Sequence, residues 1–185
     1  MFKALMRKSW VMGYLLGVKV KMTAAGLVTS VVLWLLGIGA GVWFGLPWGT
    51  AVGVGFVLML VHWFGDVWHQ LGHLVVGRRE GYQMEGLVFV WGLVGSYYPK
   101  DEPELAPIVH IKRALGGPIA TFLLVGIIGA IILVLGPERG TIGYGILQFA
   151  FWENLVLIGL GAFVPLGFTD GSSLLEWVPK WRAER

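Results

Sequence analysis

The chain has 185 residues, of which 56% are hydrophobic and only 14% are charged, and its mean hydropathy is +0.74. Soluble domains average about 45–50% apolar and about 25% charged residues, so this composition excludes an ordinary soluble domain and indicates an integral membrane protein. The absence of cysteine excludes a disulfide framework and a thiolate metal site, so any metal would be held by histidine and carboxylate side chains. The net charge of +3 says little by itself, and its distribution along the chain says more.

Residues 1–24 form a basic N-terminal segment. Apolar residues from Phe2 to Val18 share one helical face, opposite basic residues that continue to Lys21. This pattern predicts an amphipathic helix in the membrane interface, and no small-residue cleavage site indicates a signal peptide. A frayed basic tail is the alternative.

Four apolar segments are long enough to cross about 30 Å of hydrocarbon at about 1.5 Å per residue: 25–45, 51–77, 117–136 and 143–166. All of the 14 basic residues except Arg139 lie in the N-terminal segment, the connection 78–116 or the C-terminal tail. The positive-inside rule therefore predicts cytoplasmic termini and an inner, cytoplasmic membrane location. We expect a membrane domain over 25–170 and a cytoplasmic helix or tail over 171–185.

The second segment carries a polar stripe made of His62, Asp66, His69 and His73. Spacings of four, three and four place these residues on one helical face. An aspartate at the bilayer centre costs about 2.5–3.5 kcal/mol, so the stripe indicates a site or a buried polar network between helices. Haem is disfavoured, because bis-histidine haem draws its ligands from facing helices.

The segment His69-Gln70-Leu71-Gly72-His73 contains half of a metal site. In the zinc-peptidase pattern His-Glu-x-x-His, the glutamate is the general base, and Gln70 occupies that position here. Catalytic zinc takes three protein ligands. Asp170, after a helix break at Pro165, is the candidate third ligand; its alternative role is to cap a helix over 172–177.

Taken together, these motifs resemble the site-2 proteases, which are intramembrane zinc metalloproteases. Their pattern is His-Glu-x-x-His in one membrane helix, a Gly-Pro segment in the next, and Asp-Gly after a proline-broken later helix. The resemblance implies an all-α membrane protein with four transmembrane helices and a small cytoplasmic β-region. It also implies one zinc ion on His69, His73 and Asp170, and a substrate groove at the following positions: Gly117, Pro118, Thr121, Ala162 and Pro165.

The β-region implied by the resemblance would lie in the connection 78–116. Its runs 87–91 and 93–98 suit short strands. An exposed edge there would accept an extended substrate segment by strand addition. The alternative is a loop that only packs under the membrane surface.

Several positions depart from the family pattern. Gln70 replaces the base, Thr121 and Ala162 stand where asparagines are expected, and Phe168 and Thr169 replace a proline and a leucine. A general base contributes about 10²–10⁴-fold in rate, so Gln70 predicts weakened or lost proteolysis. Gln70 is either an inactivating substitution or the natural residue of a divergent subgroup, and the further departures favour the second.

Two carboxylates are candidates for a substitute base. Asp66 lies one turn before His69, and Glu153 lies in the fourth span. The alternative is that Asp66 orients a ligand histidine and that Glu153 pairs with His62 or Asp66.

Three functions follow from these motifs. The first is intramembrane proteolysis of a single-span peptide or membrane protein, weakened by Gln70. The second is an inactive pseudoprotease that binds a membrane protein, as a subunit of a larger membrane complex. The third is a structural subunit without metal. In each case we expect contact with the lipid bilayer and none with nucleic acid.

Overall fold

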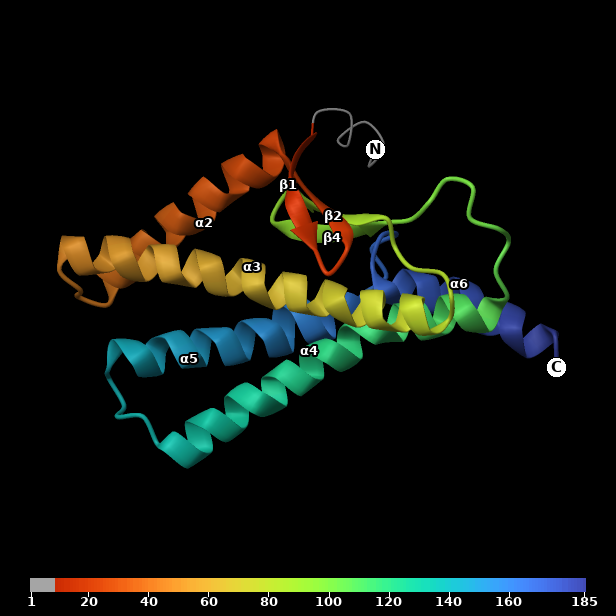
Figure 1. Ribbon diagram of the computed structural model, residues 1–185. Helices are drawn as coiled ribbons and strands as arrows, with labels where there is room; N and C mark the ends of the chain where they lie inside the picture. Colours follow the sequence, from red (N-terminus) through yellow and green to blue (C-terminus); the bar gives the residue numbers. More distant parts are fainter. Residues whose placement is uncertain (1–8) are drawn as a thin grey trace.

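Residues 9–185, the part of the chain that the computed structural model describes, contain four helices long and apolar enough to cross a membrane (Figure 1). The first three are α2 (Ala24–Trp43), α3 (Trp48–Arg79) and α4 (Pro107–Leu135). The fourth, Ile142–Phe163, is continuous in direction but changes its winding along its length. The predicted four-span architecture is therefore confirmed.

The fourth span is irregular where its polar residues begin. Helix α5 (Ile142–Trp152) continues as a π-helix, η2 (Glu153–Leu160), and ends in a 3₁₀ turn, η3 (Gly161–Phe163). Pro165 follows the last turn, as expected because the proline ring disfavours a helical conformation of the residue before it. Helix α6 (Asp170–Ala183) then begins two residues earlier than the expected start at residue 172.

The described residues also form a four-stranded sheet, which lies beside the C-terminal half of α3 and next to the start of α2 (Figure 1). Its strands are β1 (Ser9–Leu15), β2 (Val18–Thr23), β3 (Gly86–Val90) and β4 (Leu93–Tyr97), in that order. Strands β2 and β3 pair in parallel, and the other two pairs are antiparallel. The two strands expected in the connection 78–116 are confirmed.

The N-terminal segment corrects one prediction. The interfacial helix is wrong over residues 9–23, which form the β1–β2 hairpin, while residues 1–8 of that expectation lie outside the described residues. Val18, Val20 and Met22 alternate with Lys19 and Lys21, which suits a strand with one apolar face. Pairing with β3 supplies the backbone hydrogen bonds that favour the strand.

Both hairpins are closed by two-residue turns in the left-handed region. The φ angles are +48° and +81° at Leu16 and Gly17, and +47° and +75° at Trp91 and Gly92. Two successive positive φ angles are typical of the type I′ turn, whose twist matches that of the paired strands. The second turn brings the Gly92 carbonyl to helix α3.

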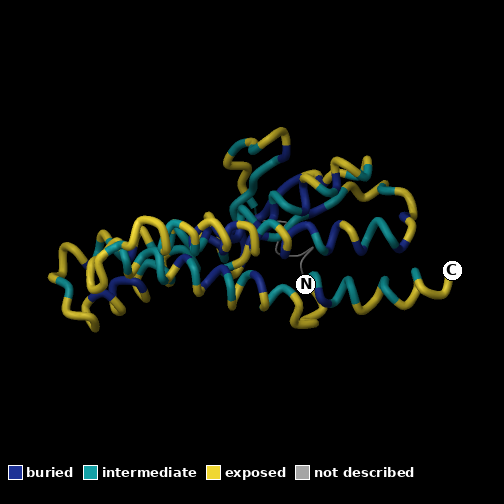
Figure 2. Tube along the Cα trace, turned by 90° about the horizontal axis from the view of Figure 1, so that it is seen from below, coloured by how far each residue is buried: buried dark blue, intermediate teal, exposed yellow. Residues whose placement is uncertain are grey.

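The sheet packs on α3 through an apolar core that includes Val18, Phe89 and Val94 from the strands and Trp63 and Leu74 from the helix. Buried and exposed residues are interleaved along the helices (Figure 2). This pattern is expected where one helix face packs on neighbours and the other faces lipid. The sheet is thereby fixed against the half of α3 that carries the polar stripe.

Candidate metal centre

Three side chains from two distant parts of the chain meet at one point. The Nε2 atoms of His69 and His73 lie 3.1 Å apart. The Asp170 carboxylate approaches both, with Oδ2 3.1 Å from His69 Nε2 and Oδ1 3.3 Å from His73 Nε2. One ligand atom from each residue lies within 4.8 Å of the others, so the three are close enough to hold one metal ion.

The hydrogen bonds on the far side of each imidazole orient the nitrogens correctly for a metal. His73 Nδ1 lies 2.7 Å from the Arg113 carbonyl oxygen, which can only accept, so Nδ1 carries the proton and Nε2 presents its lone pair. His69 Nδ1 lies 2.9 Å from the Thr121 hydroxyl, which can accept in the same way. Such outer partners fix the tautomer and ring orientation of metal-binding histidines.

Helix α4 approaches the two histidines closely because it presents glycine there. A Cβ on Gly117 would overlap Nε2 of both His69 and His73. Directly before His73 and Gly117 in the sequence, Gly72 and Gly116 bring the backbones of α3 and α4 together, and a Cβ on Gly116 would lie 2.7 Å from the Gly72 carbonyl oxygen. The three glycines therefore set the depth at which α4 meets the site.

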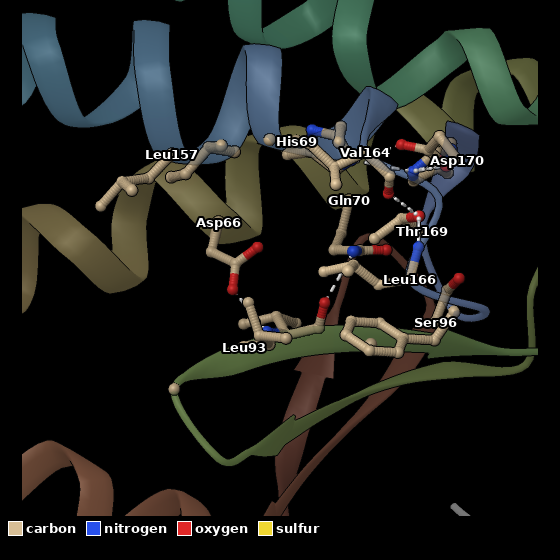
Figure 3. A pocket seen from close by; sticks show the side chains of 18 of the residues that line it. Asp66, His69, Gln70, Leu93, Ser96, Leu157, Val164, Leu166, Thr169 and Asp170 are labelled. Carbon is tan, nitrogen blue, oxygen red and sulfur yellow. Dashed lines mark hydrogen bonds and ion pairs between the residues drawn. The ribbon is translucent and has the colours of Figure 1, made fainter. Parts of the chain in front are cut away.

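Asp170 lies in the first turn of α6 and its carboxylate faces the histidines (Figure 3). Thr169 takes the N-cap position, so the alternative capping role for Asp170 does not describe its contacts. The start of α6 is held close to η3, because a Cβ on Gly171 would overlap the Phe163 carbonyl. Two imidazole nitrogens and a carboxylate are a donor set that fits catalytic zinc, with a fourth position left for a small ligand.

The ligands lie at the wall of a cavity of about 660 Å³. Its other walls are the polar residues of α3, the backbone of residues 92–96, and the segment from Leu157 to Thr169 (Figure 3). The cavity is large enough for several residues of an extended peptide. Strand β4 therefore forms one wall of the cavity that contains the candidate ligands.

A second set of α3 side chains contacts the hairpin instead of the candidate ligands. His62 Nε2 lies 3.0 Å from the Gly92 carbonyl, Asp66 Oδ2 accepts from the Val94 N–H at 2.5 Å, and Gln70 Nε2 donates to the Val94 carbonyl at 2.6 Å. The spacing of four residues places these three on one stripe of the helix. This second set joins α3 to the hairpin of β3 and β4 along the cavity wall (Figure 3).

Glu153 joins this second set from the fourth span. Its Oε1 lies 2.5 Å from His62 Nδ1, which agrees with the expected pairing of Glu153 with His62. His62 thus faces a carboxylate on one ring nitrogen and a backbone carbonyl on the other. A carbonyl oxygen can only accept a hydrogen bond, and so can a carboxylate when it is ionised.

The expected role of Asp66 is revised by its contacts. Its carboxylate bonds to the Val94 amide, whereas the ligand histidines find their outer partners in Thr121 and the Arg113 carbonyl. Asp66 and Glu153 both have other hydrogen-bond partners. Neither contact is that of a free base directed at the candidate ligands.

The five residues expected in the substrate groove separate into two groups. Ala162 lines the cavity, and Pro165 is exposed between Val164 and Leu166, which also line it. Gly117, Pro118 and Thr121 are buried in α4 and are not part of the cavity wall. Thr121 instead contacts His69 on its outer nitrogen, and Gly117 lies against the Nε2 atoms of both histidines.

Comparison with known proteins supports the architecture. No protein-family model matches the chain, and no curated protein matches it in sequence. A solved structure, the site-2 protease from Methanocaldococcus jannaschii, superimposes with a TM-score of 0.61 at 15% sequence identity, covering 90% of this chain and 69% of that one. This chain has the site-2 protease fold. At this identity, the likeness extends to the fold alone.

Sequence reasoning missed the partners that come from the backbone. The Arg113 carbonyl orients His73, and the Val94 amide and carbonyl hold Asp66 and Gln70. Every residue has these backbone groups, so no residue type in the sequence marks their positions. Thr121 was identified as a site residue from its place in the motif, although its contact is with His69.

Proposed function

We propose that this protein is a site-2 protease-like intramembrane zinc metalloprotease homologue whose proteolysis is weakened or lost through Gln70. The observation that carries the proposal is the convergence of His69, His73 and Asp170, with both Nε2 atoms turned inward. When bound, zinc would act as a Lewis acid and would lower the pKa of a coordinated water molecule to near neutrality. The donor set here suits one such ion.

The substrate proposed for this site is an extended segment of a single-span membrane protein. Strand β4 forms the cavity wall opposite the segment from Leu157 to Thr169, and it is the last strand of the sheet. An edge strand can add a peptide strand through its backbone groups. The peptide would then run beside the candidate ligands, shielded from lipid by the hairpin and the fourth span.

The residues of this chain divide the work at the proposed site. His69, His73 and Asp170 hold the ion, and Thr121 and the Arg113 carbonyl orient the two imidazoles. The Gln70 side chain is a neutral amide whose nitrogen donates to the Val94 carbonyl, so it has no basic atom with which to accept a proton. The site can therefore bind and polarise a substrate more readily than it can complete hydrolysis.

One observation favours the second candidate, a pseudoprotease that binds a membrane partner. Gln70 is 8% exposed and is bonded to β4, and Asp66 and Glu153 have partners of their own. Among the residues that line the cavity, the carboxylates are the candidate ligand Asp170 and Asp66, and Asp66 is bonded to the Val94 N–H. A protein that keeps the metal frame without a base would retain affinity for the peptide and lose turnover.

Metal analysis combined with restoration of the base tests the proposal. The purified protein is reconstituted in nanodiscs, and its zinc content is measured together with cleavage of a single-span reporter peptide. We expect about one zinc per chain, and Gln70→Glu is expected to raise cleavage by about 10²-fold or more. The double variant Gln70→Glu with His73→Ala is the matched control, and it should abolish any gain.

The outcomes separate the three candidate functions. Zinc without cleavage by either form would favour the pseudoprotease. A protein without zinc, in which His69→Ala changes neither folding nor partner binding, would leave only the structural subunit. Cleavage by the original protein that is lost on Asp66→Asn or Glu153→Gln would make one of these carboxylates a substitute base.

A further inference from the structure

Strand β4 has one paired edge and one open edge. In an antiparallel pair, the backbone groups of successive residues alternate between the partner strand and the opposite side. Val94 lies opposite Phe89 on β3, and its N–H and C=O are both taken by side chains of α3. Val94 therefore directs both backbone groups away from β3, toward the cavity.

The two side chains satisfy Val94 in the manner of a neighbouring strand. Asp66 Oδ2 accepts the N–H at 2.5 Å, and Gln70 Nε2 donates to the C=O at 2.6 Å. An added peptide strand would offer the same acceptor and donor pair to these atoms. Because Val94 is only 2% exposed, a peptide cannot reach these groups while both side chains are in place.

The next outward-facing residue along β4 is Ser96, two positions further on. No side chain of residues 9–185 is hydrogen-bonded to its backbone, and Ser96 is half-buried at the cavity wall. In Figure 3, Ser96 lies beside Leu166, on the side of the cavity where Asp170 is found, whereas Asp66 and Leu93 lie toward the other side. In this view, the open part of the edge is the part on the side of the candidate ligand Asp170.

We propose that Asp66 and Gln70 form a clamp that closes the edge of β4 at Val94 and leaves Ser96 as the point where an extended peptide adds. Gln70 is then a positioning residue of β4, with a function that a glutamate cannot perform, because an ionised carboxylate has no proton to donate to the Val94 carbonyl. The clamp is independent of the metal, whereas the peptide register rests on the proposed function.

The clamp predicts that an exchange between carboxylate and amide is tolerated at Asp66 and is not tolerated at Gln70. Asp66 faces an N–H and needs only an acceptor, so Asp66→Asn keeps its bond. Gln70 faces a carbonyl and needs a donor, so Gln70→Glu loses its bond and places negative charge against the Val94 oxygen. We expect Gln70→Glu to accelerate amide hydrogen exchange over β3 and β4 by about tenfold and Asp66→Asn to leave it within about twofold.

Two further variants separate the lost hydrogen bond from other causes. Gln70→Met removes the donor without adding charge, and it should accelerate exchange in β4 as Gln70→Glu does. Thr121→Val perturbs His69 from the other side and should leave exchange in β4 unchanged. If Gln70→Met exchanges like the original protein, or if Asp66→Asn and Gln70→Glu behave alike, the clamp is wrong.

The peptide register is tested by disulfide capture, for which the chain offers a cysteine-free background. Ser96→Cys and Leu93→Cys are each oxidised in nanodiscs with a single-span peptide that carries one cysteine. We expect at least about tenfold more capture at Ser96 than at Leu93, and capture at Leu93 should rise when Asp66→Ala and Gln70→Ala are added. Equal capture at both positions with the clamp intact would overturn the proposed register. Capture at neither position would contradict strand addition itself, while exchange still decides the clamp.

Discussion

Helix α3 carries two sets of polar side chains, and they differ in what they contact. His69 and His73 meet a carboxylate from α6, and their outer nitrogens are held by α4. His62, Asp66 and Gln70 contact the backbone of the hairpin. The first set gathers donors that a cation would bring together, whereas the second set holds the hairpin to the helix through backbone groups.

Removal of a ligand from the first set should have the largest effect on metal binding. His73→Ala is expected to reduce zinc affinity on the order of a thousandfold, because the roughly 10–16 kcal/mol of a structural zinc site is shared among few ligands. Zinc competition in detergent with a calibrated chelator measures the change. His62→Ala, a histidine of the second set, is the matched control, and an equal loss there would remove the distinction between the two sets.

Crowding the first set from α4 should have the next largest effect. Gly117→Ala places a methyl group against both Nε2 atoms, and overpacking of this kind costs about 1–3 kcal/mol. We expect reduced zinc affinity and a lower thermal midpoint. Gly126→Ala is the control on the same helix, because a Cβ there meets nothing within 4 Å. If the two variants unfold at the same temperature, Gly117 does not face the Nε2 atoms of the two histidines.

Weakening an outer partner should have a smaller effect on the metal. Thr121→Val removes the hydroxyl that lies 2.9 Å from His69 Nδ1 while keeping the side-chain volume. Loss of such a partner costs about 10–100-fold in metal affinity. Thr121→Ser retains the hydroxyl and should restore most of the affinity, so an equal loss in both variants would indicate packing as the cause.

A change in the second set should alter stability and leave zinc affinity unchanged. Glu153→Ala leaves His62 Nδ1 without its carboxylate, and the loss of a buried hydrogen-bond partner costs about 1–3 kcal/mol. Thermal unfolding in detergent measures this cost. Glu153→Gln keeps an acceptor for Nδ1 and should lose less. A fall in zinc affinity comparable to that of Thr121→Val would place Glu153 in the first set.

The sequence predicts the four spans and the shared face of His69 and His73 because both signals are local. Hydropathy predicts the ends of α2 and α3 to within three residues, whereas α4 begins at Pro107, ten residues before the predicted span. The spacing of His69 and His73 is fixed by the helical repeat. Asp170 is distant in sequence and was placed by the resemblance of several motifs. The close approach of its carboxylate to the two imidazoles is a property of the fold.

The β1–β2 hairpin was missed although a signal for it is present. The alternation from Val18 to Met22 and the Leu16-Gly17 turn favour a strand and a hairpin, but the basic residues were interpreted as one face of a helix. The parallel partner of β2 is β3, more than sixty residues later, so the pairing that decides the structure is not local. The sequence does not predict the contacts of Asp66 and Gln70 either, because their partners are the backbone groups of Val94, and every residue has such groups.

The bonds between α3 and the hairpin also constrain how the protein is made. When α3 leaves the ribosome, Gly92 and Val94 are still inside the exit tunnel, so His62, Asp66 and Gln70 must enter the membrane without their final partners. Polar groups of this kind oppose insertion into hydrocarbon. Stable insertion of the second span is therefore coupled to the folding of a segment that follows it, and truncating the chain before residue 92 would leave α3 with three polar side chains exposed to lipid or to the insertion machinery.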